Sequence, residues 1–209
     1  MDTVHDAHRI TDVATLEKLY GAPSGAAVDK EVDYLHPHYR KLIAASPFFV
    51  LATGGPGGLD ASPRGDAPGF VVVEDEKTLL VPDRRGNNRV DSLRNIIADP
   101  RVALFFLVPG IGETLRVNGR AEIRTDPALL ERFSVEGKLP RSVLVVHVDT
   151  VFFQCARAIF RSQLWDPARH IARASLPSTG TIVSDLTNSR FDGRQYDDGH
   201  YERMKNALY

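Results

Sequence analysis

The sequence has few of the residues that cross-link a chain. Among 209 residues there is one cysteine, Cys155, which cannot form a disulfide within the chain. A single cysteine excludes the disulfide-based scaffolds of small secreted proteins and favours a reducing compartment, so we expect a cytoplasmic protein. Cys155 itself is expected to be a buried, small apolar residue rather than a redox thiol.

The sequence also lacks a large excess of charge of either sign, and it lacks long apolar runs. The 26 basic and 27 acidic residues leave a formal net charge of -1, so there is no overall basic field for nucleic acid or an anionic membrane. The longest apolar stretch, residues 102–109, is far shorter than the roughly 18 to 20 residues of a membrane span. Residues 1–9 are too polar for a secretion signal. The sequence predicts a soluble protein with no nucleic-acid or membrane partner.

Signatures of metal sites and phosphate-binding loops are absent as well. The seven histidines, including His36 and His38, have no acidic or cysteine partners at metal-ligand spacing. The glycine run at residues 54–58 is not followed by Gly-Lys-Ser/Thr, and the run at 109–113 joins two predicted strands. Both runs are therefore interpreted as turns, and no metal site is predicted.

The sequence does contain a series of short strands. Between residues 48 and 153, β-branched and aromatic segments alternate with clusters of glycine, proline and aspartate. The predicted strands are 48–53, 61–64, 70–73, 78–81, 102–108, 114–124 and 143–153. The predicted helices are 11–20, 28–45 with a break or kink at Pro37, 87–99, 127–133 and 156–162. Because the strands follow one another with few helices between them, we expect a mainly β protein with an antiparallel barrel.

Composition and pattern together suggest one principal domain with two extensions. The expected divisions are an N-terminal helical extension at residues 1–45, the barrel domain at 46–167, and a C-terminal extension at 168–209. The C-terminal extension is polar enough to pack on the barrel or to be partly flexible.

The first candidate site lies between Arg84 and Ser92, where a strand is followed by two arginines, a glycine and a predicted helix. Helix N-termini present unpaired amides, and arginine forks match phosphate oxygens, so this segment could hold the phosphate of a mononucleotide. Asn88 and Ser92 would share one helix face. The alternative is a solvated turn in which Asn87 only caps the helix.

The second candidate site is the segment from Asp60 to Asp66, a strand interrupted by proline and glycine. Pro63 cannot donate a hydrogen bond to a neighbouring strand, so it should lie at a sheet edge or a bulge. Free backbone groups there could face a planar ligand. The alternative is an ordinary irregular hairpin.

Five segments in a fixed order resemble a known family. They are SPFFVLAT at 46–53, SPRGD at 62–66, VPDRRGNNRVDSLRNI at 81–96, PRVALFF at 100–106 and ETLRVNGRA at 113–121. Together they resemble the pyridoxamine phosphate oxidase-like FMN-binding split-barrel superfamily and are most similar to a bacterial subfamily of FMN-dependent enzymes within it. The resemblance covers about residues 40–167. It implies a split β-barrel with flanking helices.

The resemblance also implies an FMN held between two copies of the chain. The ring would lie against the backbone of residues 62–64 and 81–83, and the phosphate would lie on Asn88 and Arg89. The implied cofactor-binding residues are Ser62, Pro63, Arg64, Val81, Pro82, Asp83, Asn88, Arg89, Ser92 and Thr114, the last from the second chain. Arg161 and Trp165 are candidate substrate contacts, the arginine by charge and the indole by stacking. Alternatively, Trp165 packs against a helix end and Arg161 pairs with Asp166.

The activity implied is an FMN-dependent oxidoreductase that acts as a homodimer on a small-molecule substrate, with NADH or NADPH as a candidate electron donor. The sequence lacks the basic second-strand pattern and the Arg-His substrate motif of the vitamin-B6 oxidases, so that activity is not expected. No catalytic residue is assigned. Two alternatives stay open: a protein that stores or senses flavin or binds haem without turnover, and a deazaflavin-dependent reductase on the same fold.

Overall fold

A computed structural model describes residues 8–209 of the chain, which forms two compact units, Met1–Glu31 and Val32–Tyr209. The described part of the first unit holds helices α1 (Val13–Tyr20) and α2 (Gly25–Asp29). The predicted absence of a secretion signal falls mostly on residues 1–7, which lie outside the described part. The predicted divisions after residues 45 and 167 stay predictions.

Helix α1 begins and ends as the sequence predicts. The side chain of Asp12 accepts a hydrogen bond from the amide of Thr15 at 2.8 Å, which satisfies one of the free amides of the first turn. Gly21 follows the helix with φ of 72°, a positive value that glycine adopts without steric cost, and its amide donates to the carbonyl of Glu17.

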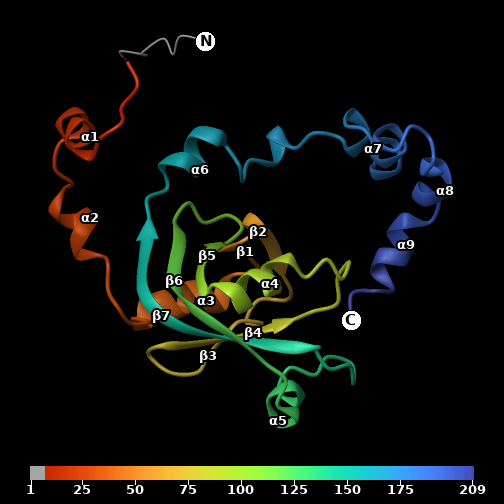
Figure 1. The fold of residues 1–209 in the computed structure, drawn as a ribbon, viewed down its shortest axis with the longest axis horizontal. Helices are drawn as coiled ribbons and strands as arrows, with labels where there is room; N and C mark the ends of the chain where they lie inside the picture. The colour runs from red at the N-terminus through yellow and green to blue at the C-terminus, as the bar shows by residue number, and fades with distance from the viewer. Residues whose placement is uncertain (1–7) are drawn as a thin grey trace. The chain divides into compact units, whose positions relative to one another are not determined.

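The second unit is built on one antiparallel sheet (Figure 1). Within residues 8–209 it has seven strands in the order β2-β1-β5-β6-β7-β4-β3. The strands are β1 (Phe48–Gly55), β2 (Gly58–Gly65), β3 (Val72–Val73), β4 (Thr78–Asp83), β5 (Arg101–Leu107), β6 (Thr114–Arg124) and β7 (Ser142–Gln154). The two ends of the sheet, β2 and β3, do not pair with each other, so the barrel is open along one side. The predicted split barrel is confirmed.

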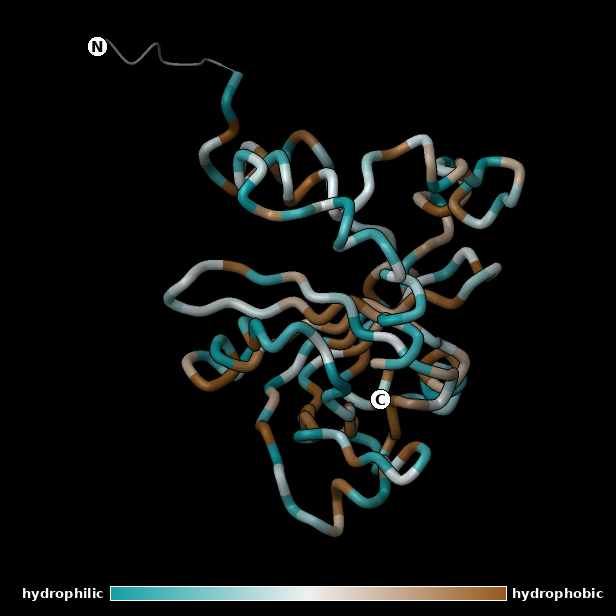
Figure 2. Tube along the Cα trace, turned by 90° about the vertical axis from the view of Figure 1, so that its right-hand side faces the viewer, coloured by the Kyte–Doolittle hydropathy of each residue, from teal (hydrophilic) through white to brown (hydrophobic). Residues whose placement is uncertain are grey.

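The long strands β6 and β7 form the centre of the sheet. Leu115, Val117 and Ala121 of β6 are buried while Arg120 and Glu122 are exposed, which confirms the alternation seen in the sequence. Between Asn118 and Gly119 the register with β7 shifts by a bulge, which bends the strand pair. Figure 2 shows the apolar segments gathered where the strands cross and the hydrophilic segments mostly in the loops.

Helices α3 and α4 of the second unit complete the core. The α-helices of this unit are α3 (Pro37–Ala45), α4 (Asp91–Ala98), α5 (Pro127–Glu131), α6 (Arg157–Ser162), α7 (Thr179–Leu186), α8 (Gly193–Asp197) and α9 (His200–Lys205). Tyr39 and Ile43 of α3 and Ile96 of α4 pack into the same apolar cluster as the strands. The helix predicted over 28–45 is divided, with Pro37 as the first residue of α3, because proline is tolerated only in the first turn.

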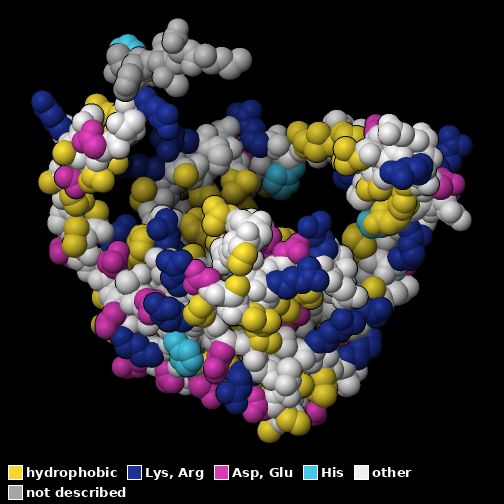
Figure 3. Space-filling model, viewed as in Figure 1, with side chains coloured by type: hydrophobic (Ala, Val, Ile, Leu, Met, Phe, Trp, Pro, Cys, Tyr) yellow, Lys and Arg dark blue, Asp and Glu magenta, His cyan; other side chains and the backbone are white. Residues whose placement is uncertain are grey.

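Beyond the barrel, the segment 156–209 carries many exposed apolar side chains. Figure 3 shows apolar surface on the connection between α6 and α7, where Ile171 and Leu176 are exposed. Cys155 is exposed, so the prediction that it is buried is wrong, because β7 ends at Gln154 and the chain leaves the sheet there. No helix within the described residues is long and apolar enough to cross a membrane.

Candidate functional site

A cavity lies at the open side of the barrel, between the edge strand β2 and the end of β4. Its volume is about 440 Å³, within the range of small-molecule sites. The lining comes from β2, the end of β4, the segment 84–90, the first turn of α4 and the start of β7. Two segments that are apart in sequence, 60–65 and 82–93, therefore line one cavity.

Both strands turn an unpaired backbone edge toward this opening. Strand β2 pairs only with β1. Strand β4 pairs with β7 along its whole length but with β3 only at Leu79 and Leu80, so the second edge of Val81–Asp83 has no partner in the sheet. Unpaired strand edges present free backbone groups, and here Pro63 and Pro82 contribute a carbonyl but no amide hydrogen. Such edges suit a flat ligand with hydrogen-bonding atoms on its rim.

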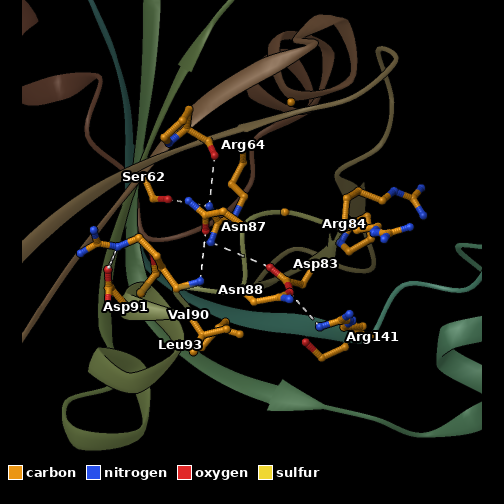
Figure 4. Close-up of a pocket in the computed structure, with 18 of the residues that line it drawn as sticks. Ser62, Arg64, Asp83, Arg84, Asn87, Asn88, Val90, Asp91, Leu93 and Arg141 are labelled. Carbon is orange, nitrogen blue, oxygen red and sulfur yellow. Dashed lines mark hydrogen bonds and ion pairs between the residues drawn. The ribbon is translucent and has the colours of Figure 1, made fainter. Parts of the chain in front are cut away.

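Arg64 and Asp83 face each other across the cavity (Figure 4). Arg64 donates from Nη1 to the hydroxyl of Ser62 at 2.7 Å and to the carbonyl of Pro63 at 3.1 Å, while its Nη2 lies 3.9 Å from Oδ1 of Asp83. Both side chains are about one-fifth exposed. Burial raises the pKa of Asp83 above its ordinary value, although Arg64 and Arg141 oppose the shift.

Segment 84–90 does not form the helix that was predicted to begin at residue 87. Helix α4 begins at Asp91, and both Asn88 and Val90 have a left-handed backbone, with φ of 61° and 54°. The prediction that Asn88 and Ser92 share a helix face is therefore wrong, as is the alternative in which Asn87 caps the helix. A β-branched residue in this conformation is strained, and such strain is most often found where a site requires it.

The first turn of α4 holds the other wall of the cavity. Ser92 is buried and donates its hydroxyl hydrogen to Oδ2 of Asp60 on β2 at 2.5 Å. Arg89 reaches Asp91 with Nε at 2.8 Å and remains largely exposed. The contact between Ser92 and Asp60 therefore joins the helix to the edge strand.

Arg141 is a site residue that sequence reasoning missed. Its Nη1 donates to Oδ1 of Asn88 at 2.9 Å, so it holds the side chain that was predicted to bind phosphate. Arg141 precedes β7, and β7 starts beside the end of β4 because Ser142 pairs with Asp83. Only that register brings residue 141 to the cavity, and no local pattern in the sequence marks it.

The lining is more basic than acidic. Five arginines line the cavity, Arg64, Arg84, Arg85, Arg89 and Arg141, against three aspartates, Asp60, Asp83 and Asp91. In Figure 3, basic side chains are conspicuous around the place where the segment between β4 and α4 lies. The site can therefore accept an anionic group.

The structure separates the predicted site residues into two groups. Those that line the cavity are Ser62, Pro63, Arg64, Pro82, Asp83, Asn88, Arg89 and Ser92. Val81 is buried in the barrel core beside them, with its backbone at the unpaired edge of β4. Thr114, Arg161 and Trp165 do not line this cavity. Their predicted roles stay predictions.

The second group lies toward the other end of β6 and β7. Thr114 is buried, and its hydroxyl lies 3.4 Å from Oε1 of Gln154. Trp165 donates from Nε1 to the carbonyl of Ile111 at 2.8 Å, and Asp166 caps the turn that follows. Since a strand rises about 3.3 Å per residue, roughly 30 Å of strand separates Thr114 from the cavity end of β6.

Comparison with known proteins identifies the family. A family model described as pyridoxamine 5'-phosphate oxidase matches residues 35–155, more than half of the chain. The chain belongs to the pyridoxamine 5'-phosphate oxidase family. The match includes every strand of the barrel and all of the lining residues of the cavity. No curated protein matches the chain.

Solved structures of bacterial proteins are also similar. HupZ from Group A Streptococcus is 20% identical, with 57% of this chain and 94% of that chain covered and a TM-score of 0.47. General Stress Protein 26 from Bacillus anthracis is 18% identical, with 55% and 88% covered and a TM-score of 0.41. A FAD-binding protein from Mesorhizobium loti is 17% identical, with 56% and 92% covered and a TM-score of 0.38.

Proposed function

We propose that this member of the family is an FMN-dependent oxidoreductase that binds its flavin in the cavity between β2 and β4. The observation that carries the proposal is the joining of two unpaired strand edges to an arginine-lined segment in one cavity. A flavin mononucleotide has the same two parts, a flat ring with hydrogen-bonding atoms on its edge and a phosphate dianion.

The residues of the cavity fit both parts. The strand edges at 62–64 and 81–83 would face the ring, and Asn88 with Arg89 would take the phosphate, with Arg141 holding Asn88 in place. Arginine pairs well with phosphate because its planar fork matches two oxygens at once. Five arginines line the cavity against three aspartates, and even with Arg84 paired to Asp66 an excess of positive charge remains to attract a dianion.

When bound, FMN supplies the hydride or electron transfer, and the protein supplies binding, orientation and electrostatics. Arg64 is held by the oxygens of Ser62 and Pro63, so its charge is fixed at the cavity wall before a ligand arrives. Asp83 is the ionisable group facing Arg64. Since burial raises the pKa of Asp83, this carboxyl takes up a proton more readily than an exposed aspartate would.

We further propose that the working form is a homodimer. The open barrel and the segment 156–209 leave large apolar side chains exposed, among them Phe160, Ile171 and Leu186, and a second copy could cover them. Thr114 would then approach the cavity of the partner, as the resemblance implies, and Arg161 and Trp165 stay candidate substrate contacts. A monomer in sedimentation or gel filtration would contradict this part of the proposal.

The lining residues weigh against haem as the ligand of this cavity. Haem iron is held by histidine, cysteine, methionine or tyrosine, and none of these is among the residues of 8–209 that line it. A deazaflavin fits the same donor set as FMN. The absorbance spectrum and the mass of the released chromophore distinguish the two.

The test is the spectrum of the purified protein together with the mass of its released chromophore, for the wild type and for the double variant Asn88→Ala/Arg89→Ala. We expect FMN in the wild type and its loss in the double variant. Arg101→Ala is the matched control, because it removes an exposed arginine outside the cavity. A colourless wild type that cannot be reconstituted with FMN would refute the proposal. Bleaching of the bound flavin by NADH or NADPH would separate an oxidoreductase from a storage protein.

A further inference from the structure

Tyr209 touches the wall of the barrel next to the cavity. Its hydroxyl donates to Oδ1 of Asp66 at 2.6 Å, and its ring lies under the guanidinium of Arg84, 5.4 Å from the ring centre. In Figure 1 the chain end marked C lies beside the segment that follows β4. The contact spans 143 residues of sequence, and neither the family match nor the sequence motifs include it.

Arg84 is held on three sides by this cluster. Its Nε donates to Oδ2 of Asp66 at 2.7 Å and its Nη1 donates to the carbonyl of Phe133 at 2.7 Å, while Tyr209 covers its face. The side chains of Arg84 and Asp66 are only 16% and 5% exposed. Charge-assisted hydrogen bonds in such a dry setting are strong and directional, so the position of Arg84 is well defined.

Arg84 is also the first residue of segment 84–90, which carries Asn88 and Arg89. The strained backbone at Val90 means that the segment does not adopt its shape from local preference alone. Contacts with residues outside the segment must therefore hold it in this conformation. Arg84 holds one end through Asp66, and Ser92 holds the other end through Asp60.

We propose that Tyr209 is a positioning residue of the flavin site. By completing the hydrogen bonds of Asp66 and covering Arg84, it keeps segment 84–90 in the arrangement that binds phosphate. This inference rests on the proposed function, because it assigns Asn88 and Arg89 to the phosphate of FMN. It predicts that Tyr209 affects the phosphate end of the ligand and leaves the ring end unchanged.

The test compares FMN with riboflavin, which has the same ring and no phosphate. We expect Tyr209→Phe to weaken FMN binding by about 5- to 10-fold, since losing the hydrogen bond to Asp66 loosens Arg84 while its own bonds to Asp66 and Phe133 remain. Riboflavin binding should not change. Tyr201→Phe is the matched control, because Tyr201 lies on α9 and is 72% exposed. Binding is measured by quenching of flavin fluorescence in each full-length protein.

Two results would overturn the inference: unchanged FMN binding in Tyr209→Phe, or an equal loss of FMN and riboflavin. If the wild type binds neither ligand, the proposed function fails, and hydrogen exchange of the amides of residues 84–90 then tests Tyr209 without any ligand. Faster exchange of these amides in Tyr209→Phe than in the wild type and Tyr201→Phe would support the positioning role. Equal exchange in the three proteins would refute it.

Discussion

Replacing Asp66 with asparagine tests how much the buried ion pair with Arg84 contributes to stability. The substitution keeps the shape of the side chain and one acceptor oxygen but removes the negative charge. Asp66 accepts hydrogen bonds from Tyr209, from the amide of Ala67 at 2.8 Å and from Arg84 at 2.7 Å. The asparagine can retain a neutral hydrogen bond, but Arg84 would be left as a largely buried cation without a counter-charge.

The size of the effect follows from this change. A hydrogen bond to a charged group contributes about 1.5 to 3 kcal/mol, and removing one partner of a fully buried ion pair costs about 3 to 5 kcal/mol. Because Arg84 keeps its bond to the carbonyl of Phe133 and is partly accessible, we expect the loss of stability to fall in the lower of these two ranges. Asp66→Asn should lower the free energy of unfolding by about 2 kcal/mol at pH 7, which corresponds to a Tm decrease of about 4 to 8 °C for a chain of this size.

The effect should depend on pH in a defined direction. Burial by itself raises the pKa of Asp66, but the hydrogen bonds from Tyr209, Ala67 and Arg84 outweigh it, so the net pKa lies below the ordinary value. A lowered pKa in the folded state stabilises the protein fully above the unfolded-state pKa of about 3.9, and this stabilisation is lost as the pH falls through the folded-state pKa. The difference between wild type and Asp66→Asn should therefore be constant near neutral pH and shrink below about pH 4.

Urea unfolding followed by circular dichroism, at pH 7 and at steps down to pH 3, measures this difference. Asp33→Asn is the control, because Asp33 binds Lys77 at the same distance of 2.7 Å but the two side chains are 75% and 51% exposed. Exposed pairs contribute little because water screens them, so the control should not change stability measurably. If Asp66→Asn were as neutral as the control, or if its effect grew in acid, the reasoning would be refuted.

Two further predictions concern the backbone. Gly119→Ala would place a Cβ against the carbonyl oxygen of His147, closer than the two atoms can approach, so we expect a loss of about 1 to 3 kcal/mol in urea unfolding. Gly57→Ala, with open space around the new Cβ, should be nearly neutral. Equal effects at the two glycines would contradict the packing argument. Val90→Gly removes the strain of a β-branched residue at φ of 54°, and we expect a gain of up to about 1 kcal/mol in the same assay. A clear loss of stability would show that the side chain of Val90 contributes more than its backbone strain costs.

The predictions from sequence were most accurate where the signal is local. The alternation at 114–124 predicted the bounds of β6 because one face of that strand meets the core and the other meets water. The helix predicted from residue 87 by its apolar spacing begins at Asp91, because the left-handed backbone at Asn88 and Val90 interrupts the first turn. The exposed position of Cys155 was missed because burial depends on where the chain leaves the sheet, which composition does not indicate.

The sequence by itself determined the fold class and the two segments that meet in the cavity, since strand patterns and the order of motifs are written along the chain. The tertiary structure decided what surrounds them. The register between β4 and β7 brings Arg141 to Asn88, and the path of the chain after β7 brings Tyr209 to Asp66. The first contact joins residues that are 53 positions apart in the sequence, and the second joins residues that are 143 positions apart. No pattern of neighbouring residues encodes contacts over such separations. The physical reason is that side chains bond through space, while propensity and periodicity describe only the local chain.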